Sequence, residues 1–589
     1  MYATNQLLLW LSCFSGFALA TSSPSNRCKA HPDTQSWPSA QEWSTLNKQL
    51  GGRLITPTPP AAACHSGQAA FNETQCAIIQ KAWKTQDWHT KDPVSVFWDH
   101  YTNDTCLPDP KMPCSSKGYP AYVVNASTPE HVKLGVDFAR KYKVRLVVKT
   151  TGHDFMGRSI APGALSIWTH SMNSIEYHSA HFELSGSGKL IPGDAVTVGG
   201  GTQMYDIYSA AHKRNRTVVG GAAKGVGISG YISGGGHSIL APRYGLGADQ
   251  VLEMQVVTPG GEILTVNEDR NADLFWALRG GGGSTFGVVT SVTVKTYPTP
   301  KILDITFSAF IKPNSTYYSE ILTYLISQAP YLMDAGLSGY TQITQNTPKP
   351  SPIPGMPDRT SGWFGRVILQ DARGEQDVAD IFKPINETLK HKWPGEAGLY
   401  TAVKPYDSFL DWFNVNFDSE PAGKSCYIGS WLLDAKTLTT PSSELTNALM
   451  SPILYNGEYV IFFIAGKGVI NAKPRGGGNA VNSAFRNAHI FASAVLEFPQ
   501  SNNTARLNTI DKLQKMFQPM RDLAPNSGTY VNEALPFEKD FQKKFWGSNY
   551  DRLLKIKRKV DPTDVFWCHP CVGNERWQEG EDGRLCMKK

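Results

Sequence analysis

VVKTTGHDFMGRS, residues 147–159, joins an apolar, β-branched run to a polar loop that carries one histidine, His153. The apolar run is typical of a buried strand. Gly152 and Gly157 let the backbone turn tightly after it and let its N–H groups approach a ligand. A strand that ends in such a loop favours a ligand site. A loop histidine bonded to a neighbouring carbonyl is the alternative that this stretch alone leaves open.

The residues before this loop predict a βαβ unit. Residues 121–124 have the composition of a strand, and Ser127 is placed to cap a helix with Pro129 in its first turn. A second strand over 144–148 then leads directly into the His153 loop.

Two further glycine-rich loops follow, each beside a predicted strand, and the stretch between them predicts a hairpin over 252–265 with its turn at 259–261. The window 220–236 holds eight glycines interleaved with Val and Ile, and a second cluster occupies 280–283. Each glycine disfavours a helix by about 1 kcal/mol relative to alanine, so we interpret these loops as backbone that approaches a ligand closely. A glycine-rich surface loop is the alternative. One elongated ligand that touches all three loops is the simplest explanation, and a dinucleotide has that size.

Length and composition describe a large globular chain. Its 589 residues are too many for a single hydrophobic core and are typical of two large domains, with or without a small appendage. Hydrophobic residues make up 41% and charged residues 18% of the chain, as in ordinary globular proteins. The net charge of +6 is spread along the chain without a basic stripe, so we expect no nucleic-acid partner.

The N-terminus indicates the secretory pathway. Residues 7–20 form an apolar run with an A-x-A-like end, so we predict a signal peptide over residues 1–20. The run is too short for stable membrane insertion. Seven N-x-S/T sequons support secretion as a glycoprotein; they start at Asn72, Asn103, Asn125, Asn215, Asn314, Asn386 and Asn502.

The cysteines support the same compartment. Nine lie beyond the predicted signal peptide, mostly clustered near the two ends of the chain, which in a secreted protein indicates disulfides. An odd number leaves one thiol free, and Cys426, alone in an apolar run, is our candidate. Cys568 and Cys571 have C-x-x-C spacing, for which a zinc or redox role is the alternative.

Together these stretches resemble the FAD-linked oxidases of the vanillyl-alcohol-oxidase superfamily, in the berberine-bridge-enzyme-like branch, and its secreted fungal isoamyl-alcohol-oxidase-like members. TTGHDFMGRS resembles the loop with the flavin-linking histidine. GAAKGVGISGYISGGGHS, followed by YGLGADQVL, resembles the second flavin loop, and DLFWALRGGGGSTFGVVTS the third. Near the C-terminus, YVNEA (530–534) and WGSNYDRLLKIKRKVDPTDVF (546–566) resemble the C-terminal module.

This resemblance implies an α+β fold. A two-part PCMH-type FAD-binding domain encloses an inserted substrate domain built on an antiparallel sheet. After the signal peptide, the implied segments are a disulfide-pinned N-terminal extension (21–117), the FAD-binding domain (118–300), the substrate domain (301–500) and a berberine-bridge-like segment that returns to the FAD domain (501–589).

The resemblance also implies that FAD is bonded through its 8α-methyl carbon to the ring of His153. Relatives with a second covalent link have a cysteine where this chain has Ala223, so we expect a single link. The other residues implied at the cofactor are Thr151, Gly152, Asp154, Ser159, Gly221, Val226, Gly227, Ser229, Gly230, Gly234, Val288 and Asn549.

Three side chains are implied on the catalytic side, and no metal is expected. His237 stands where many relatives have tyrosine, and a histidine is poised near neutral pH to take a hydroxyl proton; packing beside the cofactor is the alternative. Tyr530 and Glu533 occupy the family's polar positions, with Glu533 replacing a second tyrosine. The small Val226 is typical of members that pass electrons to oxygen, which favours an oxidase.

We therefore expect a secreted, monomeric FAD-dependent oxidase. It takes hydride from an alcohol, or from a C–H bond beside a heteroatom, of a small organic molecule or secondary metabolite, and oxygen becomes hydrogen peroxide. A carbohydrate oxidase and a flavin-binding protein without turnover are the alternatives. The substrate region contains several predicted strands, one of them over 457–470, and a proline-rich loop at 347–359 that is a candidate edge of the cleft. Tyr427 and Trp431 share one strand face, which lines either the substrate cavity or a core.

Overall fold

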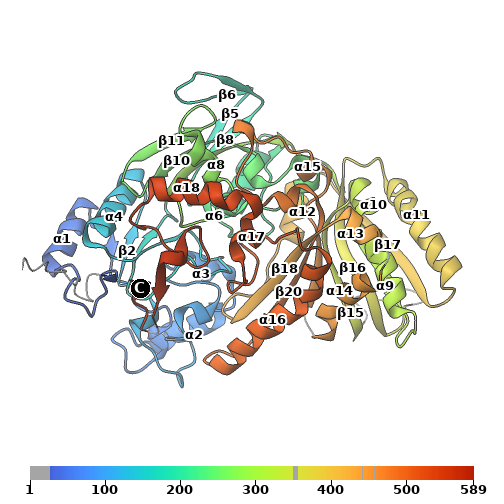
Figure 1. The fold of residues 1–589 in the computed structure, drawn as a ribbon, viewed down its shortest axis with the longest axis horizontal. Helices are drawn as coiled ribbons and strands as arrows, with labels where there is room; N and C mark the ends of the chain where they lie inside the picture. Colours follow the sequence, from blue (N-terminus) through green and yellow to red (C-terminus); the bar gives the residue numbers. More distant parts are fainter. Residues whose placement is uncertain (1–26, 349–355, 441, 456–457, 581, 589) are drawn as a thin grey trace, which may run out of the picture.

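The computed structural model describes residues 27–348, 356–440, 442–455, 458–580 and 582–588. The predicted signal peptide, and residues 349–355 of the proline-rich loop, lie outside this part of the chain. Figure 1 shows the N-terminal half on the left, a sheet with covering helices on the right, and a C-terminal segment that returns to the N-terminal half. The mixture of helices and antiparallel sheets confirms the predicted α+β class.

A small, mostly parallel sheet positions the His153 loop. β2 (Tyr122–Asn125), β4 (Leu165–Trp168) and β3 (Leu146–Lys149) are parallel neighbours, and β1 (Leu54–Ile55) pairs antiparallel with β2. Helix α4 (Pro129–Tyr142) connects β2 to β3, which confirms the predicted βαβ unit. The His153 loop begins directly after β3.

The cap of α4 corrects one local prediction. Thr128, not Ser127, is the N-cap: its backbone is extended and its side chain accepts a hydrogen bond of 3.3 Å from the N–H of His131. The Ser127 hydroxyl instead lies 3.3 Å from Nδ1 of the His131 ring. The side-chain oxygen of the residue directly before the helix meets the free N–H groups of the first turn, and that residue is Thr128.

The second sheet of the N-terminal half is antiparallel and carries the other two glycine loops. Its strand order is β11-β10-β12-β8-β5, and the predicted hairpin over 252–265 corresponds to β10 and β11. The bounds are β5 (Ile175–His178), β8 (Ala195–Gly199), β10 (Val251–Val257), β11 (Ile263–Asn267) and β12 (Val288–Lys295), with helices α5 (Met204–His212) and α8 (Ala272–Leu278).

One short helix forms where glycine content argued against a helix. α6 (Ile228–Gly234) lies inside the glycine-rich window. A Cβ on Gly234 would come within 2.2 Å of the Asn532 side chain, so close packing requires glycine there. Tertiary contacts with buried Ile228 and Ile232 therefore override the weak intrinsic propensity.

The substrate region is built on one seven-stranded antiparallel sheet, as predicted. Its order is β17-β14-β16-β15-β19-β20-β18, and helices pack on one face over the largest hydrophobic core (Figure 1). The strands are β14 (Ile302–Ile311), β15 (Ser338–Pro348), β16 (Arg359–Gln370), β17 (Ala397–Tyr406), β18 (Cys426–Asp434), β19 (Glu458–Phe463) and β20 (Ala488–Glu497); the covering helices are α9 (Tyr318–Ser327), α11 (Glu375–Lys392), α14 (Ser443–Leu454) and α16 (Asn503–Leu523).

Two expectations for this sheet are settled by packing. Tyr427 and Trp431 are both buried in the core beneath the helices, so the cavity alternative for this strand face is wrong. The strand predicted over 457–470 ends at Phe463, and α15 (Lys467–Ile470) follows. Gly466 has a φ of +83°, which glycine adopts readily and which turns the chain out of the strand.

The N-terminal extension is integrated into the molecule. α1 (Ala40–Gln49) packs on α4, and its Trp43 joins the core of the parallel sheet. Disulfides close two loops within the extension, and Cys28–Cys586 ties it to the C-terminal segment, which lies beside it in Figure 1. Cys426 is free and buried, as predicted. The remaining disulfides are Cys64–Cys76, Cys106–Cys114 and Cys568–Cys571.

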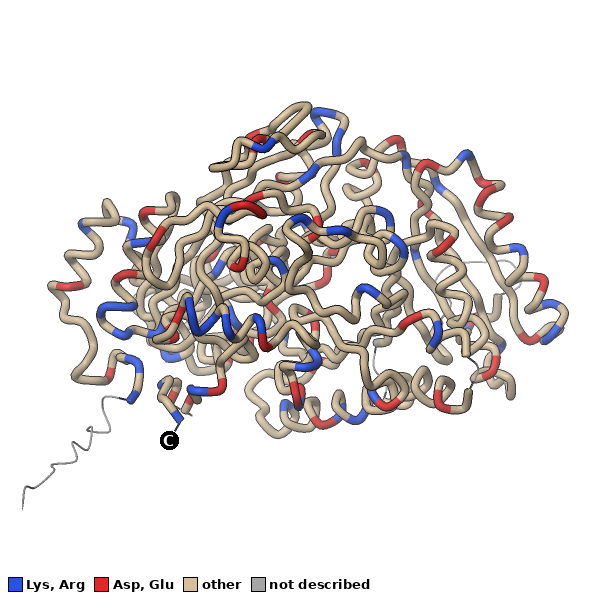
Figure 2. The backbone as a smooth tube through the Cα atoms, turned by 45° about the horizontal axis from the view of Figure 1, so that its top comes forward, with Lys and Arg blue, Asp and Glu red and all other residues tan. Residues whose placement is uncertain are grey.

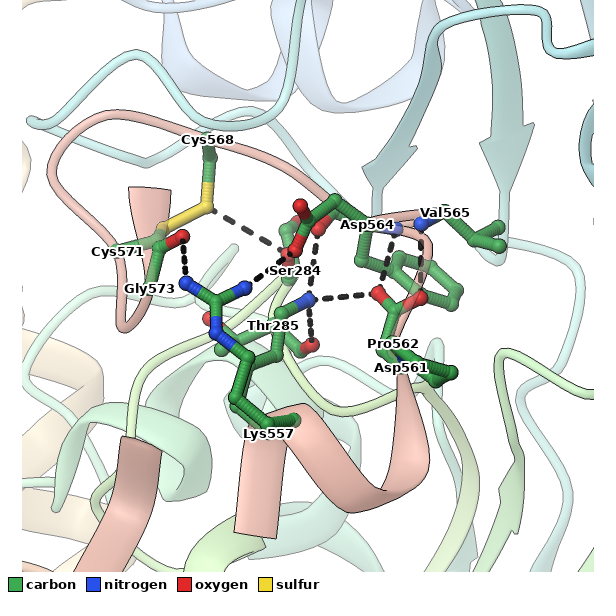
Figure 3. A network of polar contacts seen from close by, with 12 residues as sticks. Ser284, Thr285, Lys557, Asp561, Pro562, Asp564, Val565, Cys568, Cys571 and Gly573 are labelled. Atoms are coloured by element: carbon green, nitrogen blue, oxygen red, sulfur yellow. Dashed lines mark hydrogen bonds and ion pairs between the residues drawn. A yellow bond between two sulfur atoms is a disulfide. The ribbon is translucent and has the colours of Figure 1, made fainter. Parts of the chain in front are cut away.

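A buried polar network fixes the C-terminal segment to the third glycine loop (Figure 3). In α18 (Tyr550–Val560), Lys557 Nζ donates to the carbonyls of Thr285 and Phe566, at 2.9 and 2.7 Å, and pairs with buried Asp561 at 2.6 Å. The Cys568–Cys571 disulfide therefore belongs to a packed junction rather than to a zinc site.

Charged residues of both signs occur throughout the described part of the chain. Basic and acidic positions are interspersed along its backbone (Figure 2), in keeping with the modest net charge. Among the described helices, none has the length and apolar character needed to cross a bilayer.

Candidate active site

One large cavity of about 560 Å³ lies between the two halves of the molecule. The three glycine-rich loops line it on one side, and strands β15, β18, β19 and β20 line it on the other. Its volume lies within the usual range for ligand pockets, roughly 300–1,000 Å³. All three loops that the sequence grouped together therefore meet at one site.

His153 lines this cavity, and residues of the N-terminal extension pack against its loop. The ring centroids of Phe97 and His153 are 4.0 Å apart. The Phe97 N–H donates to the Gly152 carbonyl at 3.1 Å. Trp98, the next residue, lines the cavity and stacks on Phe155 at 4.4 Å. The extension is thus part of the site wall.

The environment of His153 keeps its imidazole neutral. Burial, followed by the nearby Lys149 and His89, lowers the pKa of His153 to about 3. Its Nε2 atom is buried and lacks a hydrogen-bond partner among the described residues. A neutral imidazole keeps a lone pair that can bond to an electrophilic carbon. The chemistry at this position therefore fits a covalently linked flavin.

The glycine loops leave room for an elongated cofactor. A Cβ on Gly230 or Gly283, which both line the cavity, would have no protein atom within 4 Å. At Gly227 the constraint is different, because a Cβ would come within 2.4 Å of Thr150. The loops thus combine open backbone facing the cavity with tight packing behind it, and these residues fit FAD.

His237 and Glu533 form a hydrogen-bonded pair across the cavity. His237 Nε2 lies 2.8 Å from Glu533 Oε1, and the two side chains are 11% and 21% exposed. A carboxylate can only accept, so Nε2 carries the proton and His237 donates. The His237 ring centroid is 5.2 Å from that of Tyr530 and 6.0 Å from that of Phe462. Its Nδ1 atom is buried and unpartnered within the described ranges.

Tyr530 is presented to the cavity as a hydrogen-bond donor. Its oxygen accepts from the Gly236 N–H at 3.3 Å and from Asn532 Nδ2 at 3.1 Å. Burial, with the nearby Glu533, raises the pKa of Tyr530, so its phenol stays protonated. Both acceptor positions are then occupied and the O–H remains free to donate.

Asn532 connects the two sides of the site. Its Oδ1 accepts from Arg158 Nη2 at 2.8 Å, and Arg158 is ion-paired with Asp154 in the His153 loop. One chain of polar contacts therefore runs from the His153 loop through Asn532 to Tyr530.

Most of the predicted site residues line this cavity, and four do not. The Ser229 hydroxyl donates to the Gly200 carbonyl at 2.6 Å, and Gly234 packs against Asn532. Val288 is buried in β12, and Asn549 Nδ2 donates to the Val481 carbonyl at 2.9 Å. The predicted residues that line the cavity are Thr151, Gly152, His153, Asp154, Ser159, Gly221, Val226, Gly227, Gly230, His237, Tyr530 and Glu533.

Several residues that line the cavity were not predicted from the sequence. Trp98 belongs to the extension, where the aromatic run at 97–98 was the available signal. Tyr340 and Phe462 lie on neighbouring strands whose pairing no local pattern reveals. Asp418 follows α12 (Phe409–Asn416) in a loop without a motif.

Comparison with known proteins agrees with this geometry. A family model for the FAD binding domain matches residues 120–267, and one for berberine and berberine-like proteins matches residues 529–573. The FAD-linked oxidoreductase patO of Aspergillus clavatus is 33% identical over 96% of this chain and 95% of its own. The chain belongs to the VAO-type FAD-linked oxidoreductases. As a member of that family it is an FAD-binding enzyme.

The VAO-type architecture extends over nearly the whole chain. The crystal structure of the VAO-type flavoprotein MtVAO713 from Myceliophthora thermophila superposes with a TM-score of 0.85 at 28% identity, covering 95% of this chain and all of that one. A glucooligosaccharide oxidase from Acremonium strictum, which carries a 6-S-cysteinyl, 8α-N1-histidyl FAD, shares the fold with a TM-score of 0.60 at 19% identity over 78% of this chain and 93% of its own. The two-part flavin domain with an inserted substrate domain is therefore confirmed for this VAO-type enzyme.

Proposed function

We propose that this enzyme is an oxidase that converts an alcohol, or another C–H group beside a heteroatom, to the carbonyl or its equivalent, with reduction of oxygen to hydrogen peroxide. The observation that carries the proposal is the His237–Glu533 pair, which faces the same cavity as His153. When bound, FAD supplies the hydride acceptor and the reaction with oxygen. The protein then has to remove one proton and hold the substrate.

Glu533 takes the hydroxyl proton of the substrate. One of its oxygens is bonded to His237, and the other has no hydrogen bond from a described residue. It is also the more exposed member of the pair. The His237 Nε2–H fixes the carboxylate in position, so His237 is a positioning partner here rather than the first proton acceptor. A positioned general base contributes about 10²- to 10⁴-fold in rate.

Tyr530 orients the substrate oxygen. Its O–H is the free group of a phenol whose oxygen already accepts two hydrogen bonds. A donor fixed in this way binds the hydroxyl oxygen while Glu533 accepts the hydroxyl proton, which places the C–H bond for transfer. Val226, which lines the cavity, leaves space for oxygen beside the cofactor.

His153 forms the single covalent link to the flavin. Two observations support this link: the His153 imidazole is neutral and unpartnered at the cavity, and the glucooligosaccharide oxidase of the same fold carries an 8α-N1-histidyl FAD. Ala223 lines the same cavity and offers no thiol for a second link. An electron-withdrawing link favours hydride acceptance from an alcohol.

We also propose that the protein is secreted as a glycoprotein. Four disulfides in the described chain suit an oxidising compartment. Five of the seven sequon asparagines are exposed and available to glycosylation: Asn72, Asn103, Asn215, Asn314 and Asn502.

The test is an aerobic assay of the purified enzyme on panels of alcohols and sugars, with oxygen uptake and peroxide measured together. We expect equal amounts of oxygen consumed and peroxide formed with at least one alcohol. Turnover confined to sugars establishes the carbohydrate-oxidase alternative. Failure of every compound to bleach the flavin without oxygen contradicts the proposal and supports a flavin-binding protein without turnover.

A further inference from the structure

The cavity holds more negative than positive charge. Four carboxylates line it, and two of them are ion-paired with basic side chains. The other two, Asp418 and Glu533, have no Lys or Arg partner in the described part of the chain. The ion-paired carboxylates are Asp154, with Arg158, and Glu420, with Lys424.

Asp418 is fixed in place beside the second glycine loop. Its N–H donates to the Ala222 carbonyl at 2.9 Å, and its backbone bridges to Ala223. Its Oδ1 accepts from the Glu420 N–H at 2.9 Å, which leaves Oδ2 free. Asp418 lines the cavity. A free carboxylate is therefore held where the proposed function places the edge of the flavin.

The charges of both free carboxylates, Asp418 and Glu533, act on Tyr340. Its hydroxyl is buried and unpartnered among the described residues. Burial raises the pKa of Tyr340, and both Glu533 and Asp418 raise it further. Burial also raises the pKa of Asp418; the carboxylates of Glu420 and Glu533 raise it further, whereas the Glu420 N–H and Lys424 lower it. Tyr340, Asp418 and Glu533 all line the same cavity.

Aromatic rings also line the cavity. Trp98, stacked on Phe155, and Phe462 on β19 line the same cavity. Aromatic rings attract cations through their electron-rich faces, by about 0.5 to 2 kcal/mol. Free carboxylates beside aromatic rings form the chemical surroundings that bind an ammonium group.

We propose that the substrate carries a positively charged amine close to the carbon that is oxidised, and that Asp418 binds this ammonium group. The inference rests on the proposed oxidase function and specifies its substrate class. Glu533 remains the proton acceptor, so Asp418 determines specificity without taking part in bond breaking. Anionic substrates, such as hydroxy acids, are disfavoured by the two uncompensated carboxylates.

The experiment compares three benzylic alcohols of matched shape: 4-(trimethylammoniomethyl)benzyl alcohol, its neutral neopentyl isostere and its carboxymethyl analogue. We expect kcat/KM for the cation to exceed that for the neutral isostere by about 10- to 100-fold, the range of a charge-assisted contact. The carboxylate should be the poorest of the three. The advantage of the cation should shrink as salt rises.

Asp418→Asn should remove this advantage, so that the ratio of kcat/KM for the cation to kcat/KM for the neutral alcohol, both measured on the variant, falls by about 10- to 100-fold. Asp407→Asn is the matched control, because it removes the same charge from an exposed residue that does not line the cavity. The cation's advantage should also fall as pH drops through the raised pKa of Asp418, because the protonated carboxyl no longer attracts an ammonium group.

Equal kcat/KM for the cation and the neutral isostere, or an unchanged preference in Asp418→Asn, overturns the inference and leaves the oxidase proposal intact. If no alcohol reduces the flavin, the oxidase proposal fails. Binding of benzyltrimethylammonium, measured by the change in flavin absorbance, then tests whether Asp418 binds a cation. Weaker binding to Asp418→Asn than to wild type supports it. If Asp418→Asn does not fold, the salt dependence of the three wild-type rates decides.

Discussion

The cavity has two walls that are built in different ways. The glycine wall consists of three short stretches, residues 150–159, 221–230 and 283–284, whose glycines bring backbone to the cavity. The side-chain wall consists of single residues from distant segments: Tyr340, Asp418, Phe462 and Glu533. A wall made of backbone needs glycine at fixed spacings and so leaves a motif in the sequence. A wall made of side chains can be changed one residue at a time, which suits the part of the site that selects the substrate.

The largest expected effect tests the glycine wall. His153→Ala should abolish covalent flavin attachment, because it removes the nucleophilic ring. The measurement is flavin fluorescence in a denaturing gel and the colour of acid-precipitated protein. His181→Ala is the control, since this exposed histidine lies outside the cavity. Flavin that stays covalently bound in His153→Ala places the link elsewhere.

The next effect tests the side-chain wall. Glu533→Gln should lower the rate of flavin reduction by about 10²- to 10⁴-fold, because the amide keeps the shape but cannot accept the proton. Covalent flavin content should stay at the wild-type level. His237→Ala should reduce the rate less, since it leaves the carboxylate in place. A Glu533→Gln enzyme with a wild-type reductive rate contradicts the assignment of the base.

A third change tests whether the N-terminal extension belongs functionally to the glycine wall. Phe97→Ala should lower the covalently linked fraction without abolishing it, because one aromatic contact of about 1 kcal/mol no longer fixes the His153 ring. The same gel fluorescence measures it. Phe97→Tyr should restore the wild-type fraction. Full linkage in Phe97→Ala shows that the backbone alone positions His153.

The smallest effect tests the connection between the walls. Asn532→Ala removes the acceptor of Arg158 and one donor to Tyr530. A hydrogen bond of this kind contributes about 1 kcal/mol, so we expect a reductive rate about fivefold lower. Stopped-flow reduction measures it, with Asn503→Ala on the exposed surface of α16 as the control. An unchanged rate indicates that the two walls act independently.

Much of the fold was predictable because local patterns and tertiary packing agreed. The βαβ unit before His153, the hairpin of β10 and β11, and the buried, unpaired Cys426 all follow from short stretches. The N-cap of α4 was missed by one residue, and the larger failure occurred where long-range contacts decide. α6 forms although its glycines disfavour a helix, because Ile228 and Ile232 are buried in the tertiary structure, and Gly234 leaves room for Asn532, a residue 298 positions away in the chain.

The sequence by itself determined the glycine wall. Its backbone must approach a cofactor closely, and that steric requirement restricts the residue type at each position. His153, Gly227 and Gly230 are therefore recognisable without a structure.

Only the tertiary structure decided which partners meet in the side-chain wall, although Glu533 itself was a candidate from the sequence. His237 and Glu533 form a pair because the C-terminal segment returns across the cavity, and Asp418 joins them because its loop bonds to Ala222. The energies of such contacts depend on distances between residues that no local pattern restricts. Contiguous motifs thus determine which cofactor binds, while the substrate that binds depends on which distant side chains the fold brings together.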